Sequence, residues 1–81
     1  FLRVQLKSRF GIYGKYLNKD IWIAYIENGE FYLYPHDVVS EWLSKEAWYN
    51  GPKSMAEKES YTWNKTPARV KSYLEKFKIP K

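Results

Sequence analysis

The sequence predicts an α+β fold, in which a small mixed β-sheet carries helices packed on it. Asn28 and Gly29 stand between two apolar runs, and this pair is the strongest short signal for a β-hairpin because both residues readily adopt positive φ. Two later segments repeat their apolar residues at helical spacing. The resulting order of strand, loop, hairpin, helix, irregular loop and helix is that of a small sheet covered by helices.

The first predicted strand covers about residues 1–8 and has a two-residue repeat. Its two sets of side chains point to opposite faces, Leu2, Val4 and Leu6 to one and Arg3, Gln5 and Lys7 to the other. A glutamine and a lysine side by side are costly to bury unless a ligand, a metal or a phosphate pairs with them. The alternative is an edge or surface strand whose polar face is solvated.

A loop and the predicted hairpin follow the first strand. Residues 10–16 carry two glycines among aromatic residues, so we expect a flexible or sharply turning loop before the hairpin. The run 21–26 is apolar on both faces, which is typical of a buried central strand. The strand 30–34 follows the turn, and Pro35 closes it. The residues of this hairpin expected in the core are Trp22, Tyr25, Phe31 and Leu33.

Two helices are predicted in the second half of the chain. The first begins at Asp37, which can cap it, and extends to about Ala47. The turn-rich residues 48–64 are expected to be irregular. A second, amphipathic helix is predicted over about 67–78, with Thr66 as its N-cap and a proline at its first position. The apolar positions are Val38, Val39, Trp42 and Leu43 in the first helix and Val70, Tyr73, Leu74 and Phe77 in the second.

Length and composition limit the classes of protein to which this chain belongs. Its 81 residues make a single domain or the C-terminal fragment of a larger one, and Phe1 already lies in a strand-like pattern, so we expect residues before it. Because there is no cysteine and one histidine, disulfides, thiolate metal sites and zinc sites are excluded. No apolar run is long enough to span a bilayer, and no signal-peptide pattern is present. We therefore expect a soluble, cytoplasmic protein.

The charge favours an anionic partner. The formal net charge is +5, which favours chiefly nucleic acid or anionic lipid. Positive charge is concentrated near the start of the chain, at Arg3, Lys7, Arg9, Lys15 and Lys19.

Other candidate groups are weaker. His36 stands beside Asp37, but no cysteine nucleophile or serine elbow accompanies this pair, so a polar helix start is the preferred interpretation. Asp20 is interpreted as a turn residue rather than a metal ligand. Tyr13 and Tyr16 either stack on bases or pack within the protein, and the sequence leaves both alternatives open.

Several short motifs in the first half resemble the PD-(D/E)xK nuclease superfamily, the restriction-endonuclease-like enzymes. They are the run VQLKSR over 4–9, the run DIWIAYI over 20–26 and the run EFYLYP over 30–35. The resemblance covers roughly residues 1–43 and implies a nuclease-like core and a Mg²⁺-dependent DNA endonuclease, that is, a phosphodiester hydrolase.

The resemblance also assigns roles to individual residues. Lys7 matches the catalytic lysine, and Gln5 takes the acidic position of the motif, where a neutral amide is a weak ligand for Mg²⁺. The aspartate that binds the metal in this superfamily is expected upstream of Phe1 or from a partner chain. The expected phosphate contacts are Arg3, Ser8, Arg9, Lys15 and Lys19.

The partner implied is DNA, and a homodimer is plausible because double-strand cleavage needs two sites. Two alternatives stay open. One is a non-catalytic nucleic-acid-binding or protein-interaction module with a nuclease-like fold, supported by Gln5 and the missing aspartate. The other is a purely structural domain.

Overall fold

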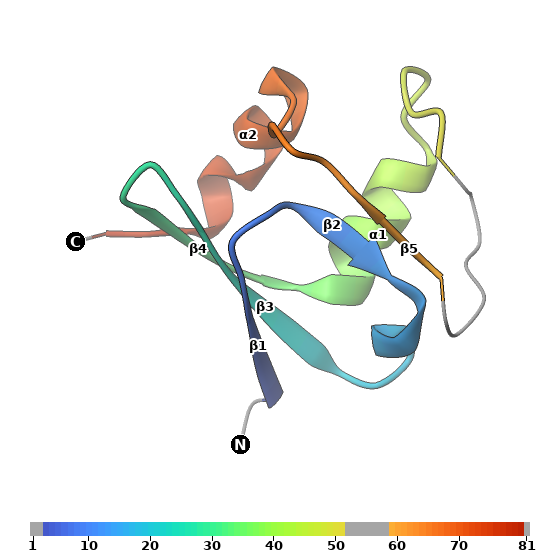
Figure 1. Ribbon diagram of the computed structural model, residues 1–81, viewed down its shortest axis with the longest axis horizontal. Helices are drawn as coiled ribbons and strands as arrows, with labels where there is room; N and C mark the ends of the chain where they lie inside the picture. Colours follow the sequence, from blue (N-terminus) through green and yellow to red (C-terminus); the bar gives the residue numbers. More distant parts are fainter. Residues whose placement is uncertain (1–2, 52–58, 81) are drawn as a thin grey trace.

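A computed structural model describes residues 3–51 and 59–80 of the chain. Its main sheet has four strands in the order β1-β3-β4-β6, of which β1 and β3 are parallel and the other neighbours antiparallel (Figure 1). These strands are β1 (Arg3–Lys7), β3 (Ile21–Glu27), β4 (Glu30–Pro35) and β6 (Lys78–Ile79). The predicted α+β class, with a small mixed sheet and helices packed on it, is confirmed.

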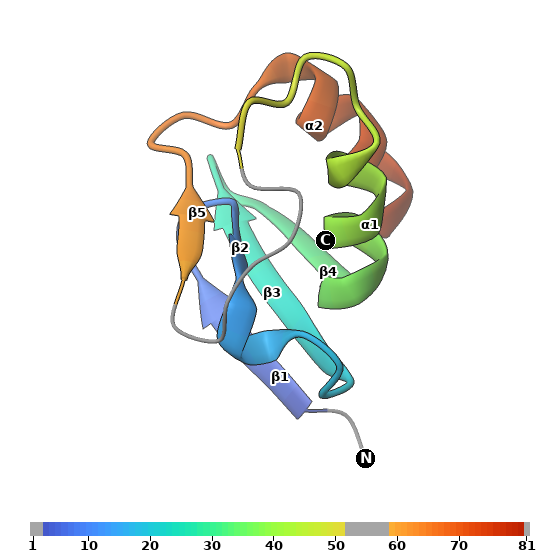
Figure 2. The ribbon, with the colours of Figure 1, turned by 90° about the vertical axis from the view of Figure 1, so that its right-hand side faces the viewer.

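All the other elements lie on one side of the main sheet (Figure 1). They include a second sheet of two antiparallel strands, and Figure 2 shows the two α-helices next to each other on this same side. None of the helices in the described ranges is long and apolar enough to cross a membrane. The elements are β2 (Gly11–Tyr13), β5 (Ser60–Thr62), α1 (His36–Ser44), α2 (Ala68–Leu74) and the 3₁₀ helices η1 (Gly14–Tyr16) and η2 (Glu75–Phe77).

The predicted hairpin is confirmed. Asn28 and Gly29 connect β3 to β4 with φ of 50° and 78°, the positive values that a tight hairpin turn requires. The strands stay in register from this turn to the Trp22–Pro35 pair, and Pro35 is the last residue of β4. β3 lies between β1 and β4, as expected of a central strand.

The two faces of the main sheet have different surroundings. The covered face packs against the helices and the second sheet, and its most buried residues are Ile23, Tyr25, Tyr32 and Tyr34. Helix residues Val39, Leu43, Val70 and Leu74 complete this core, as the helical spacing predicts. The opposite side, which we call the open face, carries Val4, Leu6, Trp22, Ala24, Ile26, Phe31, Leu33, Pro35 and Ile79.

Three residues that were predicted to lie in the core lie on the open face instead. Phe31 is 44% exposed rather than buried, and Trp22 and Leu33 are only partly buried, because nothing in the described chain covers their side of the sheet. Val38 is 50% exposed, so it does not share the buried face of α1 with Val39 and its neighbours. Leu2, which was placed on the same face as Val4, lies outside the described residues.

Two segments predicted to be irregular contain regular structure. Residues 10–16 form β2 and η1 rather than a flexible loop, and within 48–64 the segment 60–62 is the partner strand β5. Such pairing between distant segments leaves little local signal in the sequence. Residues 52–58 of the second segment lie outside the described part of the chain. The predicted second helix ends at Leu74, and η2 and β6 follow it.

The caps of both helices also differ from the prediction. α1 begins at His36, and the Asp37 carboxylate accepts a hydrogen bond from the backbone N–H of Asn18 at 2.9 Å instead of capping the helix. α2 has Pro67 at its N-cap, and the carbonyl of Pro67 accepts hydrogen bonds from the first turn. Thr66 is buried, and its hydroxyl is hydrogen-bonded to the Tyr25 hydroxyl. This hydrogen bond connects β3 to the residue that precedes Pro67 at the start of α2.

We expect Gly11→Ala to destabilise the fold by about 1–3 kcal/mol, because a Cβ at this position would lie 2.6 Å from the Cγ2 atom of Thr62 on β5. Thr62→Ser removes that methyl group and should restore part of the lost stability in the double variant. Urea denaturation of the two single variants and the double variant measures this coupling. Equal losses from Gly11→Ala in both backgrounds would contradict the close packing of β2 on β5.

Candidate nucleic-acid interface

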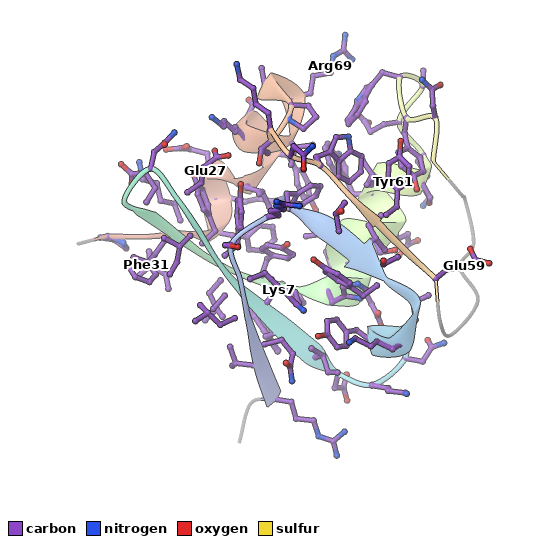
Figure 3. The ribbon with its side chains drawn as sticks, viewed as in Figure 1. Lys7, Glu27, Phe31, Glu59, Tyr61 and Arg69 are labelled. Atoms are coloured by element: carbon purple, nitrogen blue, oxygen red, sulfur yellow. The ribbon has the colours of Figure 1, made fainter. Side chains whose placement is uncertain are left out.

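Lys7 is the last residue of β1 and points to the covered side of the sheet. It is aligned with the buried Tyr25 of β3, and side chains at aligned positions of neighbouring strands share a face. Figure 3 shows Lys7 on the side of β2 and Phe31 on the opposite, open side. The Lys7 side chain is therefore partly buried, although β1 is an edge strand of the sheet.

The ammonium group of Lys7 lies over two tyrosine rings. Its Nζ atom is 4.5 Å from the ring centroid of Tyr13 and 5.2 Å from that of Tyr16. Both distances are within the range of cation–π attraction. The two rings are themselves in contact, with centroids 5.2 Å apart. The two rings hold the cation in place, and no carboxylate among residues 3–51 and 59–80 forms an ion pair with it.

β2 and η1 position the two rings. Tyr13 ends β2, and its backbone N–H donates a hydrogen bond to Nε2 of His36 at 3.0 Å. Gly14 follows, and its backbone N–H donates to the carbonyl of Glu59 at 2.8 Å. Tyr16 is buried beneath this turn, whereas Tyr13 stays partly exposed. Packing within the protein is thus established for Tyr16, whereas Tyr13 is only partly buried.

His36 is a positioning residue for this region. It is 2% exposed, and because its Nε2 accepts from Tyr13, the ring proton is assigned to Nδ1, which lies 3.2 Å from Oδ1 of Asp37. The other Asp37 oxygen accepts from Asn18 in the turn before β3. Both ring nitrogens are engaged, so His36 has no free nitrogen for general-base catalysis. The histidine instead connects β2, α1 and this turn.

Two further cations accompany Lys7. Lys15 Nζ lies 5.3 Å from the Tyr16 ring centroid, and the exposed Arg9 acts electrostatically on Tyr13. Burial raises the pKa of the Tyr13 hydroxyl, and the positive charges of Lys7 and Arg9 partly oppose that rise. We call this group the basic-tyrosine surface, and it comprises Lys7, Arg9, Tyr13, Lys15 and Tyr16. Of the other predicted contacts, Ser8 is exposed next to Lys7.

Arg3 and Lys19 lie apart from this surface. Together with Asn18 and Asp20 they line an open hollow of about 460 Å³ at the start of β1. Asn18 and Asp20 have φ of 61° and 54°, so this segment is a tight turn, as predicted for Asp20. Four residue steps along a strand separate Arg3 from Lys7, or about 13 Å. The predicted phosphate contacts therefore form two groups rather than one.

Gln5 lies between the two groups on β1. It faces the same side as Lys7, is exposed, and is aligned with Ile23 of β3. Within residues 3–51 and 59–80, no three acidic, histidine or cysteine side chains come close enough together to hold a metal ion. Because Mg²⁺ prefers carboxylates and water to a neutral amide, the described residues alone do not fit a magnesium site beside Lys7.

Sequence reasoning missed His36 as the residue that positions this site. The sequence shows that Asp37 follows His36. Only the fold shows that Nε2 of His36 accepts a hydrogen bond from the backbone N–H of Tyr13, 23 residues earlier. The spacing of Tyr13 and Tyr16 carried no such signal, because Tyr13 is extended at the end of β2 and only Gly14–Tyr16 form the 3₁₀ turn.

Acidification should weaken the fold through His36. Burial lowers the pKa of the folded-state imidazole below its usual value near 6.5, so the unfolded chain takes up this proton first. The stabilising contribution is complete above roughly pH 6.5 and is lost as the pH falls through the folded-state pKa. Urea denaturation over this range should show the loss in the native protein and not in His36→Gln. The same pH profile in both proteins would contradict the assigned role.

Comparisons with protein-family models, with curated proteins and with solved structures found no match, so the function is inferred from this chain's own residues.

Proposed function

We propose that the basic-tyrosine surface binds DNA, with Lys7 as the central phosphate contact. The observation that carries this proposal is the Lys7 ammonium held over the Tyr13 and Tyr16 rings, beside Arg9 and Lys15. A phosphate oxygen that reaches this position meets a cation already oriented by aromatic rings. Less side-chain entropy is therefore lost on binding than for a solvated lysine.

The charge pairing of the lysines supports the proposal. Lys45, Lys71 and Lys78 each contact a glutamate carboxylate within 3.1 Å. In the part of the chain that the structure describes, Lys7 and Arg9 have no such partner. Cations without an internal counter-ion are the ones that a polyanion can neutralise, with release of counter-ions from the phosphates.

The partly exposed Tyr13 ring adds a second type of contact. Aromatic rings next to cations are typical of surfaces that stack on unpaired bases. The hollow at Arg3 and Lys19 lies about 13 Å along β1 from Lys7 and can take a second part of the same polyanion. In this proposal the protein acts on nucleic acid in the cytoplasm.

A second candidate function is Mg²⁺-dependent DNA cleavage. The observation that favours it is the common face of Gln5 and Lys7, two residues apart on β1, which is the arrangement implied by the resemblance to PD-(D/E)xK nucleases. Carboxylate ligands for the metal would have to come from outside the described residues or from a partner. Bound Mg²⁺ would stabilise negative charge at the phosphate, and Lys7 would hold the scissile phosphate beside it.

Lys7→Ala should weaken DNA binding at low salt and lower the slope of log affinity against log salt by about one, as expected for one lost phosphate contact. The matched control is Lys76→Ala. Lys76 Nζ lies 4.4 Å from the Tyr73 ring and 5.5 Å from the Phe77 ring, so the same charge and a similar contact are removed from the α2–η2 region. Fluorescence anisotropy with a labelled DNA duplex measures both variants. Equal losses in the two variants would contradict a specific surface at Lys7.

If the cleavage hypothesis holds, Lys7→Ala abolishes Mg²⁺-dependent nicking of supercoiled plasmid, whereas Lys76→Ala retains it. Gln5→Glu should raise the rate, because it places a carboxylate where the amide is a weak ligand, and Gln5 is exposed enough to accept this change without loss of the fold. Cleavage retained by Lys7→Ala would exclude the nuclease assignment and leave the binding proposal standing.

A further inference from the structure

β1 is an edge strand of the main sheet, and its outer side has no partner strand in the described ranges. The sheet order β1-β3-β4-β6 leaves this side unpaired along all five residues of β1. The first four of these residues are exposed. Every second residue of a paired strand points its backbone N–H and C=O toward the neighbouring strand, and the residues between them point these groups outward. The outward groups of β1 can therefore pair with another extended chain.

The backbone of β1 is suited to such pairing. The strand contains no proline, and its alignment with β3 is uninterrupted over all five residues, so it has neither of the backbone features, proline and bulge, that close a sheet edge. The opposite edge of the sheet differs, because β6 has two residues and its Lys78 is ion-paired with Glu30 at 3.1 Å. β1 is thus the edge of the main sheet at which an added strand fits.

The side chains of β1 decide which strand fits. Arg3 and Lys7 lie on one face, at the two ends of the strand and about 13 Å apart, and neither forms an ion pair within the described ranges. Val4 and Leu6 lie on the open face, with exposed fractions of 45% and 68%. The complementary strand has carboxylates four residues apart on one side and apolar side chains on the other.

A second copy of this chain is a poor match for this edge. If two β1 strands paired antiparallel over all five residues, they would be centred on Gln5, and Arg3 of each copy would lie opposite Lys7 of the other. Like charges directly opposite each other destabilise a strand pair. The net charge of +5 on each copy adds to this repulsion. The two cations therefore oppose self-pairing and favour an acidic strand.

We propose that the outer edge of β1 binds an extended acidic segment of a partner protein, which adds a strand to the main sheet. Hydrogen bonds between the backbones supply affinity, and the two charge pairs supply specificity. The inference does not rest on the proposed function, because it requires neither DNA nor the tyrosine rings. A carboxylate beside Lys7 would occupy the cation assigned to a DNA phosphate, so the acidic segment and DNA should compete.

Isothermal titration calorimetry of the full chain with the synthetic peptide acetyl-TEVTVET-amide, in the absence of DNA, tests the proposal. This peptide places two glutamates four residues apart and reads the same in both directions, so it suits parallel and antiparallel addition. The lysine analogue acetyl-TKVTVKT-amide should bind at least about tenfold more weakly, because two attractive cross-strand charge pairs become repulsive.

A matched pair of charge reversals locates the binding edge. Arg3→Glu should weaken binding of the acidic peptide and narrow its preference over the lysine analogue. Arg69→Glu makes the same change of charge at an exposed position on α2, away from β1, and should have a much smaller effect (Figure 3). Equal losses of affinity in the two variants would overturn the proposal.

N-methylation of the peptide separates strand addition from attraction between charges alone. One methylated peptide carries the methyl groups on its two valine nitrogens, and the other carries them on its two glutamate nitrogens. These nitrogens point to opposite sides of an added strand, so one peptide should bind as the parent does and the other should not bind. Equal affinities of the two methylated peptides would contradict strand addition.

Hydrogen exchange followed by NMR provides a direct readout at the edge. The outward β1 amides should exchange fast in the free protein and become protected when the acidic peptide binds. Protection of these amides in the free protein at high concentration would assign the edge to a second copy and overturn the proposal. Since none of these measurements contains DNA, their failure and the failure of the proposed DNA binding are distinguishable.

Discussion

The alignment of β1 with β3 is the constraint on which the rest of the site depends. The two strands are parallel, and Lys7 of β1 is aligned with Tyr25 of β3. The lysine side chain must therefore lie on the same face of the sheet as the buried tyrosine. A shift of one residue would exchange the faces and place Leu6 on the covered side and Lys7 on the open side. The register thus decides both which residues can bind a ligand and which form the apolar surface.

The covered face is built largely from aromatic residues, and its polar atoms are only partly paired. The Tyr25 hydroxyl is bonded to Thr66, and burial raises its pKa to about 12. The Tyr34 hydroxyl is buried without a hydrogen-bond partner among the described residues, which is a cost to the fold. The apolar area of these large rings offsets that cost, and Phe10 contacts Tyr25, Tyr34 and Trp63 between the main and the second sheet.

The parts of the fold that could be predicted were those encoded locally. The Asn28-Gly29 turn and the helical spacing of Val70 and Leu74 each depend on a few neighbouring residues. The pairing of β2 with β5 could not be predicted, because it joins segments about fifty residues apart with ordinary composition. Phe31 was misplaced because alternation shows that two faces exist but not which of them is covered.

The same distinction applies to the site. The sequence predicts Gln5 and Lys7 on one face, and the structure places them there. The sequence does not show that this face is the covered one. It also does not show that the Lys7 ammonium lies over the Tyr13 and Tyr16 rings, or that His36 accepts a hydrogen bond from the backbone of Tyr13. Arg3 and Lys19 were grouped with Lys7 by charge alone, and the fold separates them because they lie at the opposite end of β1.

The central claim is that Lys7 and its two tyrosines form the surface that meets a nucleic acid. The most direct measurement is an NMR titration of the isotopically labelled protein with a short DNA oligonucleotide at low salt. We predict that the largest shift changes occur at Lys7 and in the Tyr13 and Tyr16 rings, with Lys76 and Tyr73 unchanged. Largest changes at Lys76 and Tyr73, or on the open face around Leu6, would contradict this account.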